Sequence, residues 1–404
     1  MKAAVVGGGL AGLAAALDLV DADVDVTLYE ARPTLGGAVQ TLPARDGDPE
    51  PPPDNGQHIA LGCFTEYLRF LDRVGERGSV LRKRLALPVI AEDGAVSSIT
   101  PTGLLLYRHL PLRDRLRLPL VLARLRNAEA NGTFGDVLRR LGTSDVAIDR
   151  FWDVFIRPAL NLRTDEVDAG AGLFTVRTAL LGPRANADLV LPLRPLGAMH
   201  GDAAARVLGD RVRLGERVES LDDLDADAIV VAVPPRESAR LLDEPDPLLE
   251  DSPIVSVHLW FDRPLLKTPL AALLSSDAHW VFDRGALTGH QPPAGGQYLT
   301  VVSSGVPELL ALRGKELVDG IAAQLTDRLG AAELLWSRVS REPYATIALR
   351  PGVVRPGPET KRPGVVRAGA WTDTGWPATM ESAVRSGRAA AARVLEPAPS
   401  TVRA

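Results

Sequence analysis

The chain has almost no cysteine and no excess of positive charge, and both absences exclude classes of protein. Cys63 is the only cysteine among 404 residues, so neither an intramolecular disulfide nor a metal site built on several thiolates can form. The formal net charge is −5, whereas a nucleic-acid-binding surface normally appears as a clustered basic excess. We therefore expect a cytoplasmic protein with no metal site and no nucleic-acid partner.

The chain also lacks a long hydrophobic run that is free of glycine and charge. Residues 1–20 are apolar, but they contain four glycines and Asp18 and run directly into a strand-like pattern. This pattern favours folded structure over a signal peptide or a membrane anchor. Because single cores stop growing efficiently at roughly 250–300 residues, a chain of 404 residues predicts two lobes.

The chain begins with the pattern of a strand, a glycine-rich turn, a helix and a second strand that ends at Glu30. The turn contains G-x-G-x-x-G: Gly7 permits the tight turn, Gly9 lets the backbone approach a pyrophosphate, and Gly12 lets helix and strand pack closely. The phosphates would lie at the helix N-terminus, and Glu30 would accept the ribose hydroxyls. The predicted dinucleotide contacts here are Gly7, Gly9, Leu10, Ala11, Gly12, Glu30 and Ala31.

Further elements follow from hydrophobic period and from turn residues. Residues 45–56, RDGDPEPPPDNG, are too rich in proline and acid for regular structure and predict a flexible surface loop, with order resuming at Gln57. We predict helices at 64–76, 112–130, 134–141, 146–160, 315–329 and 378–395. We predict strands within 85–99, at 212–221, 227–233 and 365–368, and in a β-rich lobe over 252–347.

Three further stretches favour FAD over a nicotinamide. They are Leu35-Gly36-Gly37, the run DNGQH from Asp54, and the C-terminal run GAWTDTGWPATMESAVRSG from Gly369. The first and last resemble the flavin monooxygenase and amine-oxidase superfamily, in which a C-terminal Gly-x-x-x-Asp turn and its helix cover the ribityl and ring portions of FAD. The resemblance implies Asp373 as that acid. It implies these FAD contacts besides those of the first turn: Gly36, Gly37, Val218, Gly369, Asp373, Ala378 and Thr379.

Within this superfamily, which includes the phytoene desaturases, the chain resembles the squalene-associated desaturase group, the bacterial hydroxysqualene dehydroxylases. The resemblance rests on the double glycine after Glu30 and on the runs DNGQHIALGCFT, FWDVFIRPALNLRTDEV and TGWPATMESAVRSG. Two positions depart from the superfamily pattern: Ala38 stands where an arginine is common, and Ala198-Met199-His200 replaces a more glycine-rich turn. These departures concern contacts with the phosphates and the ring.

The resemblance implies an α/β fold, with a Rossmann-like FAD-binding domain of the amine-oxidase type and an interleaved α+β substrate domain. We assign residues 1–80, 200–240 and 365–396 to the FAD-binding domain. Residues 81–199 and 241–364 form the predicted substrate domain. We expect residues 397–404 to be a disordered tail.

The resemblance further implies removal of the hydroxyl of hydroxysqualene to give squalene, in bacterial triterpene and hopanoid synthesis, with reduced FAD as a non-covalent hydride donor. Hydroxide is a poor leaving group, so the reaction needs a general acid and a site that excludes water from the resulting cation. The alternatives on the same fold are a carotenoid-type desaturase or an amine oxidase. A prenyl-binding escort protein is a non-catalytic alternative.

His58 is the first candidate for the acid, since an unperturbed histidine titrates close to neutral pH. Asp54 and Glu381 are the second and third candidates. Each has a structural alternative: a hydrogen-bonded histidine at a strand end, an Asx turn, and a helix-capping acid. Trp371 and Trp376 are expected either to line the ring or to pack. Cys63 is expected to be a small core residue and not a redox or attachment site.

Residues 104–126, LLLYRHLPLRDRLRLPLVLARLR, interleave leucine with arginine. This pattern is typical of a helix that lies on a membrane surface, which would serve a very hydrophobic substrate. It is equally typical of a capping helix with a solvated basic face. A peripheral position on the inner face of the membrane therefore stands beside a purely cytoplasmic one.

Overall fold

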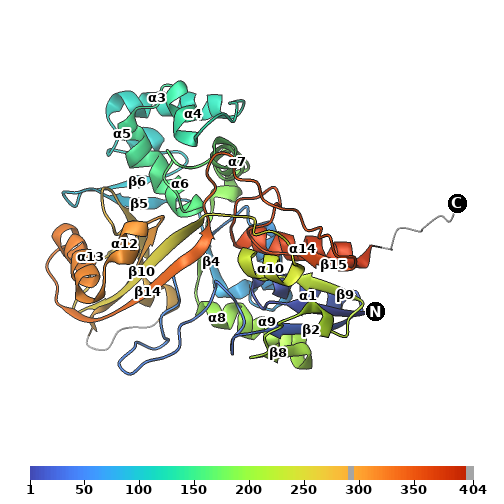
Figure 1. Cartoon of the computed structure of the whole chain (residues 1–404). Coiled ribbons are helices and arrows are strands. Elements are labelled where there is room, and N and C mark those ends of the chain that lie inside the picture. The colour runs from blue at the N-terminus through green and yellow to red at the C-terminus, as the bar shows by residue number, and fades with distance from the viewer. Residues whose placement is uncertain (290–294, 397–404) are drawn as a thin grey trace.

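A parallel five-stranded sheet forms the base of the molecule in a computed structural model that describes residues 1–289 and 295–396 (Figure 1). Its strand order is β15-β9-β1-β2-β8, and every neighbouring pair is parallel. The strands are β1 (Lys2–Val6), β2 (Asp25–Glu30), β8 (Val212–Leu214), β9 (Ala228–Val231) and β15 (Val365–Arg367). This is the Rossmann-like sheet that the first residues predict.

Helices cover both faces of this sheet because its strands are apolar on both sides. In β1, Ala3 and Val5 enter one core, whereas Ala4 and Val6 enter another, as the two-residue period of a strand requires. The first core contains residues of α1 (Leu10–Asp21), α2 (Thr65–Arg73), α9 (Gly201–Leu208) and α14 (Met380–Leu395). The second contains residues of α10 (Pro235–Leu242).

A seven-stranded mixed sheet forms the second lobe, in the order β14-β10-β13-β12-β11-β5-β6. Alternate residues of β10 (Val255, Val257, Leu259 and Phe261) share a core with residues of α12 (Pro307–Ala311) and α13 (Gly314–Leu329). The strands are β5 (Leu87–Ile90), β6 (Val96–Ile99), β10 (Asp251–Phe261), β11 (Leu270–Leu273), β12 (Trp280–Asp283), β13 (Gln297–Ser304) and β14 (Leu334–Ile347).

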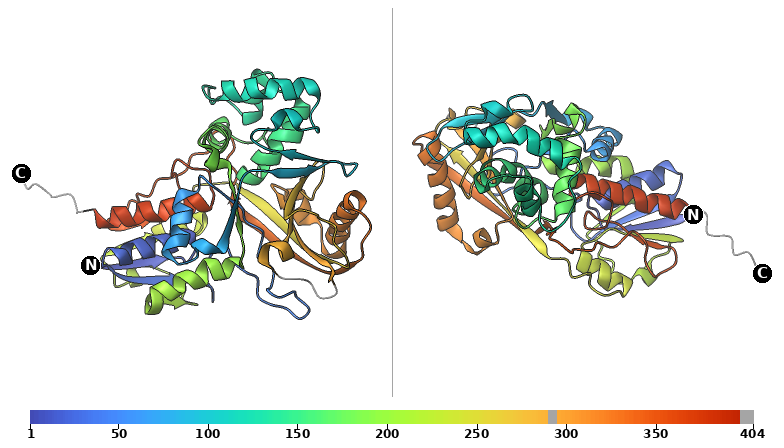
Figure 2. Two further views of the ribbon diagram at one scale, coloured as in Figure 1. Left: turned by 180° about the vertical axis from the view of Figure 1, so that it is seen from behind. Right: turned by 90° about the horizontal axis from the view of Figure 1, so that it is seen from above.

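A lobe of helices stands on the other side of this sheet, at the end away from α13 in both side views (Figures 1 and 2). It contains η2 (Leu104–Leu106), α3 (Leu112–Leu125), α4 (Phe134–Arg140), α5 (Asp145–Ala147), the π-helical η3 (Ile148–Trp152), α6 (Asp153–Leu160) and α7 (Ala169–Ala179). Edge-to-face contacts among Phe134, Phe151 and Trp152 fill its core.

Short elements connect these parts. A three-stranded antiparallel sheet joins β3 (Ala60–Leu61), β7 (Leu189–Pro192) and β4 (Val80–Lys83). The remaining elements are η1 (Arg77–Ser79), η4 (Arg184–Ala187), α8 (Leu196–Met199), η5 (Gly209–Arg211), η6 (Leu221–Asp223) and α11 (Arg284–Thr288). β7 lies in the predicted substrate domain but pairs with β3 of the predicted FAD-binding domain, so the exact boundaries stay a prediction.

The structure corrects several predictions made from local pattern. The strand predicted at 212–221 ends at Leu214, and α7, α9, α10 and the three-stranded sheet were not predicted. The predicted flexible loop at 45–56 becomes buried from Pro53 onward, before Gln57, because hydrogen bonds from distant residues hold its end. The predicted tail lies outside the described residues.

Candidate cofactor-binding and active site

The glycine turn between β1 and α1 requires glycine at two positions because other backbone atoms occupy the space of a side chain. Gly7 has φ +108°, and a Cβ there would lie 2.4 Å from the carbonyl oxygen of Ala232. A Cβ on Gly12 would lie 1.9 Å from the carbonyl oxygen of Gly7. These contacts fix the turn at the carboxyl ends of the parallel strands, where open α/β sheets bind ligands.

Gly9 differs from these two glycines because the protein leaves space beside it. A Cβ on Gly9 would have no neighbour closer than the Cα of Gly37 at 3.8 Å. Gly9 is the N-cap of α1 and makes no side-chain cap, so the first N–H groups of the helix, including those of Leu10 and Ala11, have no acceptor within the helix. Free N–H groups and the helix dipole beside open space fit a pyrophosphate.

Glu30 lies directly beside this turn at the end of β2. One carboxylate oxygen accepts a hydrogen bond from Gly8 N at 2.7 Å, and the other accepts one from Arg32 N at 2.8 Å. These bonds hold the carboxylate at the carboxyl edge of the sheet, and its remaining lone pairs can accept ribose hydroxyls. Val218 follows β8, which pairs with β2 at Glu30, and it packs in the same cluster as Tyr29.

The double glycine packs against the turn and continues into the DNGQH run. Gly36 N donates to Gly8 O, and a Cβ on Gly37 would lie 2.9 Å from Gly9 Cα. Asn55 then bonds to the segment just after the double glycine: its N donates to Gln40 O, and its Nδ2 donates to Ala38 O. These contacts hold the DNGQH run, with Asp54 and His58, next to the predicted pyrophosphate site.

Asp54 is buried where the two lobes meet. Its Oδ1 accepts hydrogen bonds from Thr41 Oγ1 at 2.7 Å and Leu196 N at 2.9 Å. Its Oδ2 lies 2.7 Å from Nη2 of Arg284 in an ion pair, outside hydrogen-bond alignment, and both side chains are 2% exposed. Burial raises the pKa of Asp54, whereas Arg284 and the two hydrogen bonds favour its ionised form. These contacts connect Asp54 to residues far away in the sequence and link the two lobes. The Asx turn considered from the sequence would involve only neighbouring residues.

Arg284 was not predicted, and it organises a polar cluster between the lobes. Its Nη1 donates to Gln57 Oε1 at 3.1 Å. Opposite it, the face of β10, β13 and β14 that points away from α13 carries Ser256, His258 and Tyr298. We define the interlobe polar cluster as Asp54, Gln57, Ser256, His258, Arg284, Tyr298 and Arg338.

Within the described part of the protein, every member of the interlobe polar cluster except Asp54 has a buried polar atom with neither a hydrogen bond nor an ion pair. These atoms are Gln57 Nε2, Ser256 Oγ, His258 Nε2, Arg284 Nε, Tyr298 Oη and Arg338 Nε, whereas Asp54 Oδ2 and Arg284 Nη2 pair with each other. Buried polar atoms are normally paired, so this concentration indicates groups that meet water or a polar ligand. No local sequence pattern could have revealed it, because the residues are far apart in the chain.

His58 is half-buried and lies beside this cluster, because a Cβ on Gly56 would lie 3.1 Å from Ser256 Oγ and 3.8 Å from His58 Nε2. Burial lowers its pKa to about 4, so the imidazole is neutral at pH 7. A neutral imidazole is a poor proton donor. At pH 7 about 10⁻³ of the His58 side chains are protonated. His58 therefore acts as the general acid either through this small fraction or after substrate binding changes its surroundings.

Glu381 caps a helix, but not the one that the sequence suggested. Its side chain is fully buried, and its oxygens accept hydrogen bonds from the backbone N–H groups of Glu66 and Tyr67 and from Arg385. It therefore caps the N-terminus of α2, which has no cap of its own. This role attaches α14 to α2 and engages both oxygens.

Asp373 lies in an exposed turn. Its carboxylate accepts hydrogen bonds from Gly375 N at 3.0 Å and from Arg355 at 3.3 Å. The residues beside the glycine turn are Gly369 and its neighbours: Ala368 N donates to Val231 O, and Trp371 Nε1 donates to Val233 O. The structure therefore brings Gly369 to the carboxyl edge of the sheet, and Asp373 stays a predicted FAD contact.

Ala378 and Thr379 connect the C-terminal run to the second lobe and to α14. Ala378 O accepts a hydrogen bond from Thr346 of β14, and Thr379 is the N-cap of α14, accepting a hydrogen bond from Ser382 N. Trp376 packs edge-on against Phe174 of α7 and lies under the Arg385 guanidinium at 4.6 Å. Trp376 is thus a packing residue between the C-terminal run and the helical lobe.

Two further residues named from sequence are buried inside the first lobe. Cys63 lies in its hydrophobic core, and burial raises its pKa to about 11, so the thiol stays protonated. His200 Nδ1 donates to Leu196 O, and its Nε2 accepts from Tyr67 Oη; burial lowers the pKa of His200 to about 4. Both environments are those of structural side chains.

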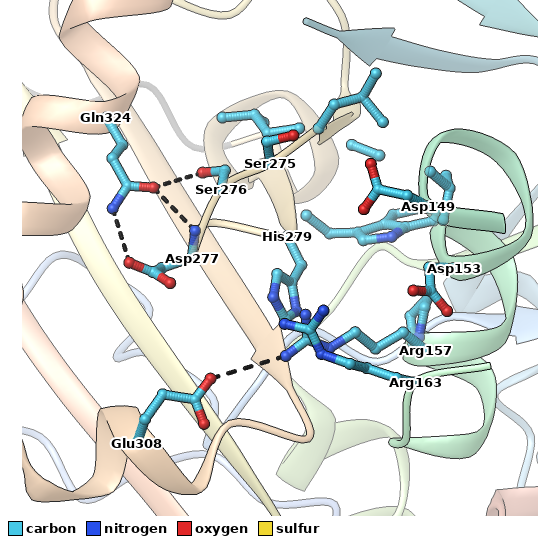
Figure 3. Close-up of a pocket in the computed structure, with 16 residues that line it drawn as sticks. Asp149, Asp153, Arg157, Arg163, Ser275, Ser276, Asp277, His279, Glu308 and Gln324 are labelled. Atoms are coloured by element: carbon cyan, nitrogen blue, oxygen red, sulfur yellow. Dashed lines mark hydrogen bonds and ion pairs between the residues drawn. The ribbon is translucent and has the colours of Figure 1, made fainter. Parts of the chain in front are cut away.

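The run FWDVFIRPALNLRTDEV forms part of a separate polar cavity of about 380 Å³ (Figure 3). Arg157 and Arg163 lie beside His279, with Glu308 4.0 Å from Arg157. On the opposite wall, Gln324 binds Ser276 and Asp277. Within residues 1–289 and 295–396, no group of three or more His, Cys, Asp or Glu side chains is arranged to hold a metal ion.

Comparison with known proteins places these features in a family context. The model of the family described as flavin-containing amine oxidoreductase matches residues 10–395. Proteins named hydroxysqualene dehydroxylase from Sinorhizobium fredii and Rhodopseudomonas palustris are each 29% identical, over 96% and 97% of both chains. These matches confirm the resemblance seen in the sequence.

Two other comparisons bear on the alternatives. A protein named probable zeta-carotene desaturase from Synechococcus elongatus is 24% identical over 98% of this chain and 99% of its own. The solved structure of cyclohexylamine oxidase from Brevibacterium oxydans aligns with a TM-score of 0.73 at 18% identity, over 97% of this chain and 98% of its own. That likeness confirms the predicted fold class.

Proposed function

Because the chain belongs to the flavin-containing amine oxidoreductase family and is an FAD-dependent oxidoreductase, we propose that it converts hydroxysqualene to squalene in bacterial triterpene and hopanoid synthesis. The observation that carries this proposal is the similarity, over 96% of both chains, to a protein named hydroxysqualene dehydroxylase. The proposed FAD is non-covalent, in keeping with a buried, protonated Cys63.

The residues of the glycine turn fit this cofactor. Gly9 leaves space for the pyrophosphate, the N-terminus of α1 supplies N–H donors, and Glu30 accepts ribose hydroxyls. When bound, FAD supplies the hydride chemistry. Retention of this site also opposes the escort-protein alternative, which needs no flavin.

The second requirement is a polar point at which the substrate hydroxyl is held and protonated. The interlobe polar cluster offers Ser256, His258 and Tyr298 as hydrogen-bonding groups whose partners are missing in the described part of the protein. We propose that this cluster, with His58 at its edge, binds the hydroxyl and delivers the proton. Apolar surroundings would then protect the cation formed as the carbon–oxygen bond breaks.

An anaerobic single-turnover experiment tests the reaction. Photoreduced enzyme mixed with hydroxysqualene should reoxidise in one substrate-dependent phase and yield one equivalent of squalene. Oxidised enzyme mixed with squalene should keep its flavin absorbance. Reduced enzyme that is not reoxidised by the alcohol would contradict the proposal.

A carotenoid-type desaturase is the second candidate, favoured by the full-length similarity to the Synechococcus protein. It would run the hydride transfer in the opposite direction. The same apparatus distinguishes it: oxidised enzyme would then lose flavin absorbance on mixing with a less conjugated polyene, and the alcohol would have no effect.

The proposed substrate also suggests where the enzyme works. Hydroxysqualene is almost entirely hydrocarbon and dissolves in bilayers and not in water. We therefore propose a position at the cytoplasmic surface of a membrane. Among the described helices, none has the length and hydropathy needed to cross a bilayer.

A further inference from the structure

The outer end of the helical lobe exposes an unusual number of leucines. Leu105 and Leu106 lie in η2, and Leu112, Leu116 and Leu120 lie in α3, and each side chain is 51–75% exposed. Single exposed leucines are ordinary on soluble proteins, but a cluster of them marks an interaction surface.

Helix geometry brings these leucines together. Leu112, Leu116 and Leu120 are four residues apart and so form one stripe along α3. The opposite face of α3, with Leu118, Val121 and Leu125, is buried in the core. The stripe is thus additional to the face that anchors the helix in the protein.

Arg115 joins the leucines of η2 to this stripe. Its guanidinium donates to Leu105 O at 3.3 Å, which attaches η2 to α3. Leu105 and Leu106 therefore stay beside the helix and do not form a separate loop.

The exposed charges of the segment that carries these leucines have one sign. Between residues 101 and 126 the only acidic residue is Asp114, and its side chain is buried. Arg113, Arg117 and Arg124 of α3 are exposed as well, and the helical period places them along one side of the stripe. We define the leucine–arginine surface as Leu105, Leu106, Leu112, Leu116 and Leu120 with Arg108, Arg113, Arg117 and Arg124.

The location of the leucine–arginine surface suits a flat partner. Figures 1 and 2 show α3 at the far end of the helical lobe, away from the parallel sheet. Arg177 of α7 attaches the end of α3 by donating to Leu125 O and Ala128 O. Because Phe174 of α7 contacts Trp376, this lobe also reaches the C-terminal run.

We propose that the leucine–arginine surface docks the protein on an anionic lipid bilayer, with the leucines at the acyl boundary and the arginines at the headgroups. A second copy of this chain fits less well, because its arginines would meet arginines of the same surface. The inference goes beyond the proposed reaction and does not depend on it.

Sedimentation of the purified holoenzyme with vesicles tests the inference. Wild-type protein should sediment with phosphatidylglycerol-containing vesicles, less with pure phosphatidylcholine, and less at high salt because exposed charges are screened. Reversing three charges, in Arg113→Glu/Arg117→Glu/Arg124→Glu, should lower vesicle partitioning about tenfold or more. Replacing leucines, in Leu106→Gln/Leu112→Gln/Leu116→Gln, should have a comparable effect.

Matched variants elsewhere on the surface serve as controls. Leu248→Gln/Leu335→Gln and Lys83→Glu/Lys267→Glu/Lys315→Glu change exposed residues outside the surface and should sediment like wild type, with flavin absorbance reporting correct folding in every variant. Equal sedimentation of all forms would overturn the inference. A wild-type dimer that the leucine variant converts to a monomer, without vesicle binding by either, would assign the surface to a protein interface instead.

Discussion

The glycine turn and the interlobe polar cluster both belong to the candidate site, but they are built in different ways. The turn uses backbone atoms of residues 7–12 together with Glu30, all within one βαβ unit. The cluster uses side chains from residues 54, 57, 256, 258, 284, 298 and 338, which only the folded chain brings together. The comparison shows that a cofactor can be predicted from local sequence, whereas the groups that meet the substrate depend on long-range packing.

The largest expected effect concerns Gly9 of the turn. Its φ of −76° and ψ of 176° suit any residue, and the protein leaves its Cβ space free. Gly9→Val should therefore fold but lose FAD, because its side chain occupies the pyrophosphate site. Flavin absorbance of the purified variant measures the loss, with Gly320→Ala on α13 as a control. A folded, yellow Gly9→Val protein would remove the turn from the cofactor site.

His58 at the edge of the cluster should affect chemistry without affecting FAD. If it donates the proton, His58→Ala should slow single-turnover reoxidation by roughly 10²–10⁴-fold. The wild-type rate should fall as pH rises above its pKa of about 4, since only the protonated imidazole acts as an acid. A variant with an unchanged rate and pH profile would make His58 a structural residue.

Removing the interlobe ion pair should lower the free energy of unfolding much more than removing an exposed ion pair. Arg284→Met leaves the buried Asp54 carboxylate without its cation and should lower the free energy of unfolding by about 3–5 kcal/mol. Arg284→Met/Asp54→Asn should recover part of this loss. Urea denaturation measures both. Arg139→Met, which breaks exposed pairs with Asp145 and Asp165, is the control and should cost about 1 kcal/mol. Equal effects at the two sites would contradict the anchoring role.

A smaller effect is expected from Glu30→Ala. Loss of a charge-assisted contact with the ribose should weaken FAD binding by roughly 1.5–3 kcal/mol. Titration of the apoprotein by calorimetry measures this change. Glu30→Gln, which keeps one acceptor oxygen for Gly8 N, should lose less. Unchanged affinity in both variants would remove Glu30 from the ribose site.

The stability of the folded protein should decrease gradually as the pH is lowered. Burial lowers the pKa of His58 and His200 to about 4 and of His258 to about 3. Because the unfolded chain binds protons first, at a pKa of about 6.5, stability is full above that value and decreases as pH falls toward 4. His200→Gln should flatten the dependence of melting temperature on pH between 7 and 5. A parallel curve would show that His200 titrates normally.

Features that depend on interactions between residues close in the sequence could be predicted, whereas features that depend on long-range contacts could not. The turn, Glu30 and the double glycine were predicted because each has a backbone requirement that glycine or one acid meets locally. Glu381 and Asp54 were named as acids from their positions, yet their partners, the N-terminus of α2 and Arg284, come from elsewhere in the chain. For Glu381 the sequence offered one sign: Phe64 precedes α2 and cannot cap it, so another residue had to supply the cap.

By itself, the sequence determined the Rossmann-like sheet, FAD and the family, because strand period, turn geometry and anion binding at a helix end are properties of short segments. Only the tertiary structure decided which face of α3 is buried, where Asp54 finds its cation, and which polar atoms meet between the lobes. Those outcomes depend on contacts between distant residues, and the desolvation of a buried charge or hydroxyl is defined only once its surroundings have folded around it.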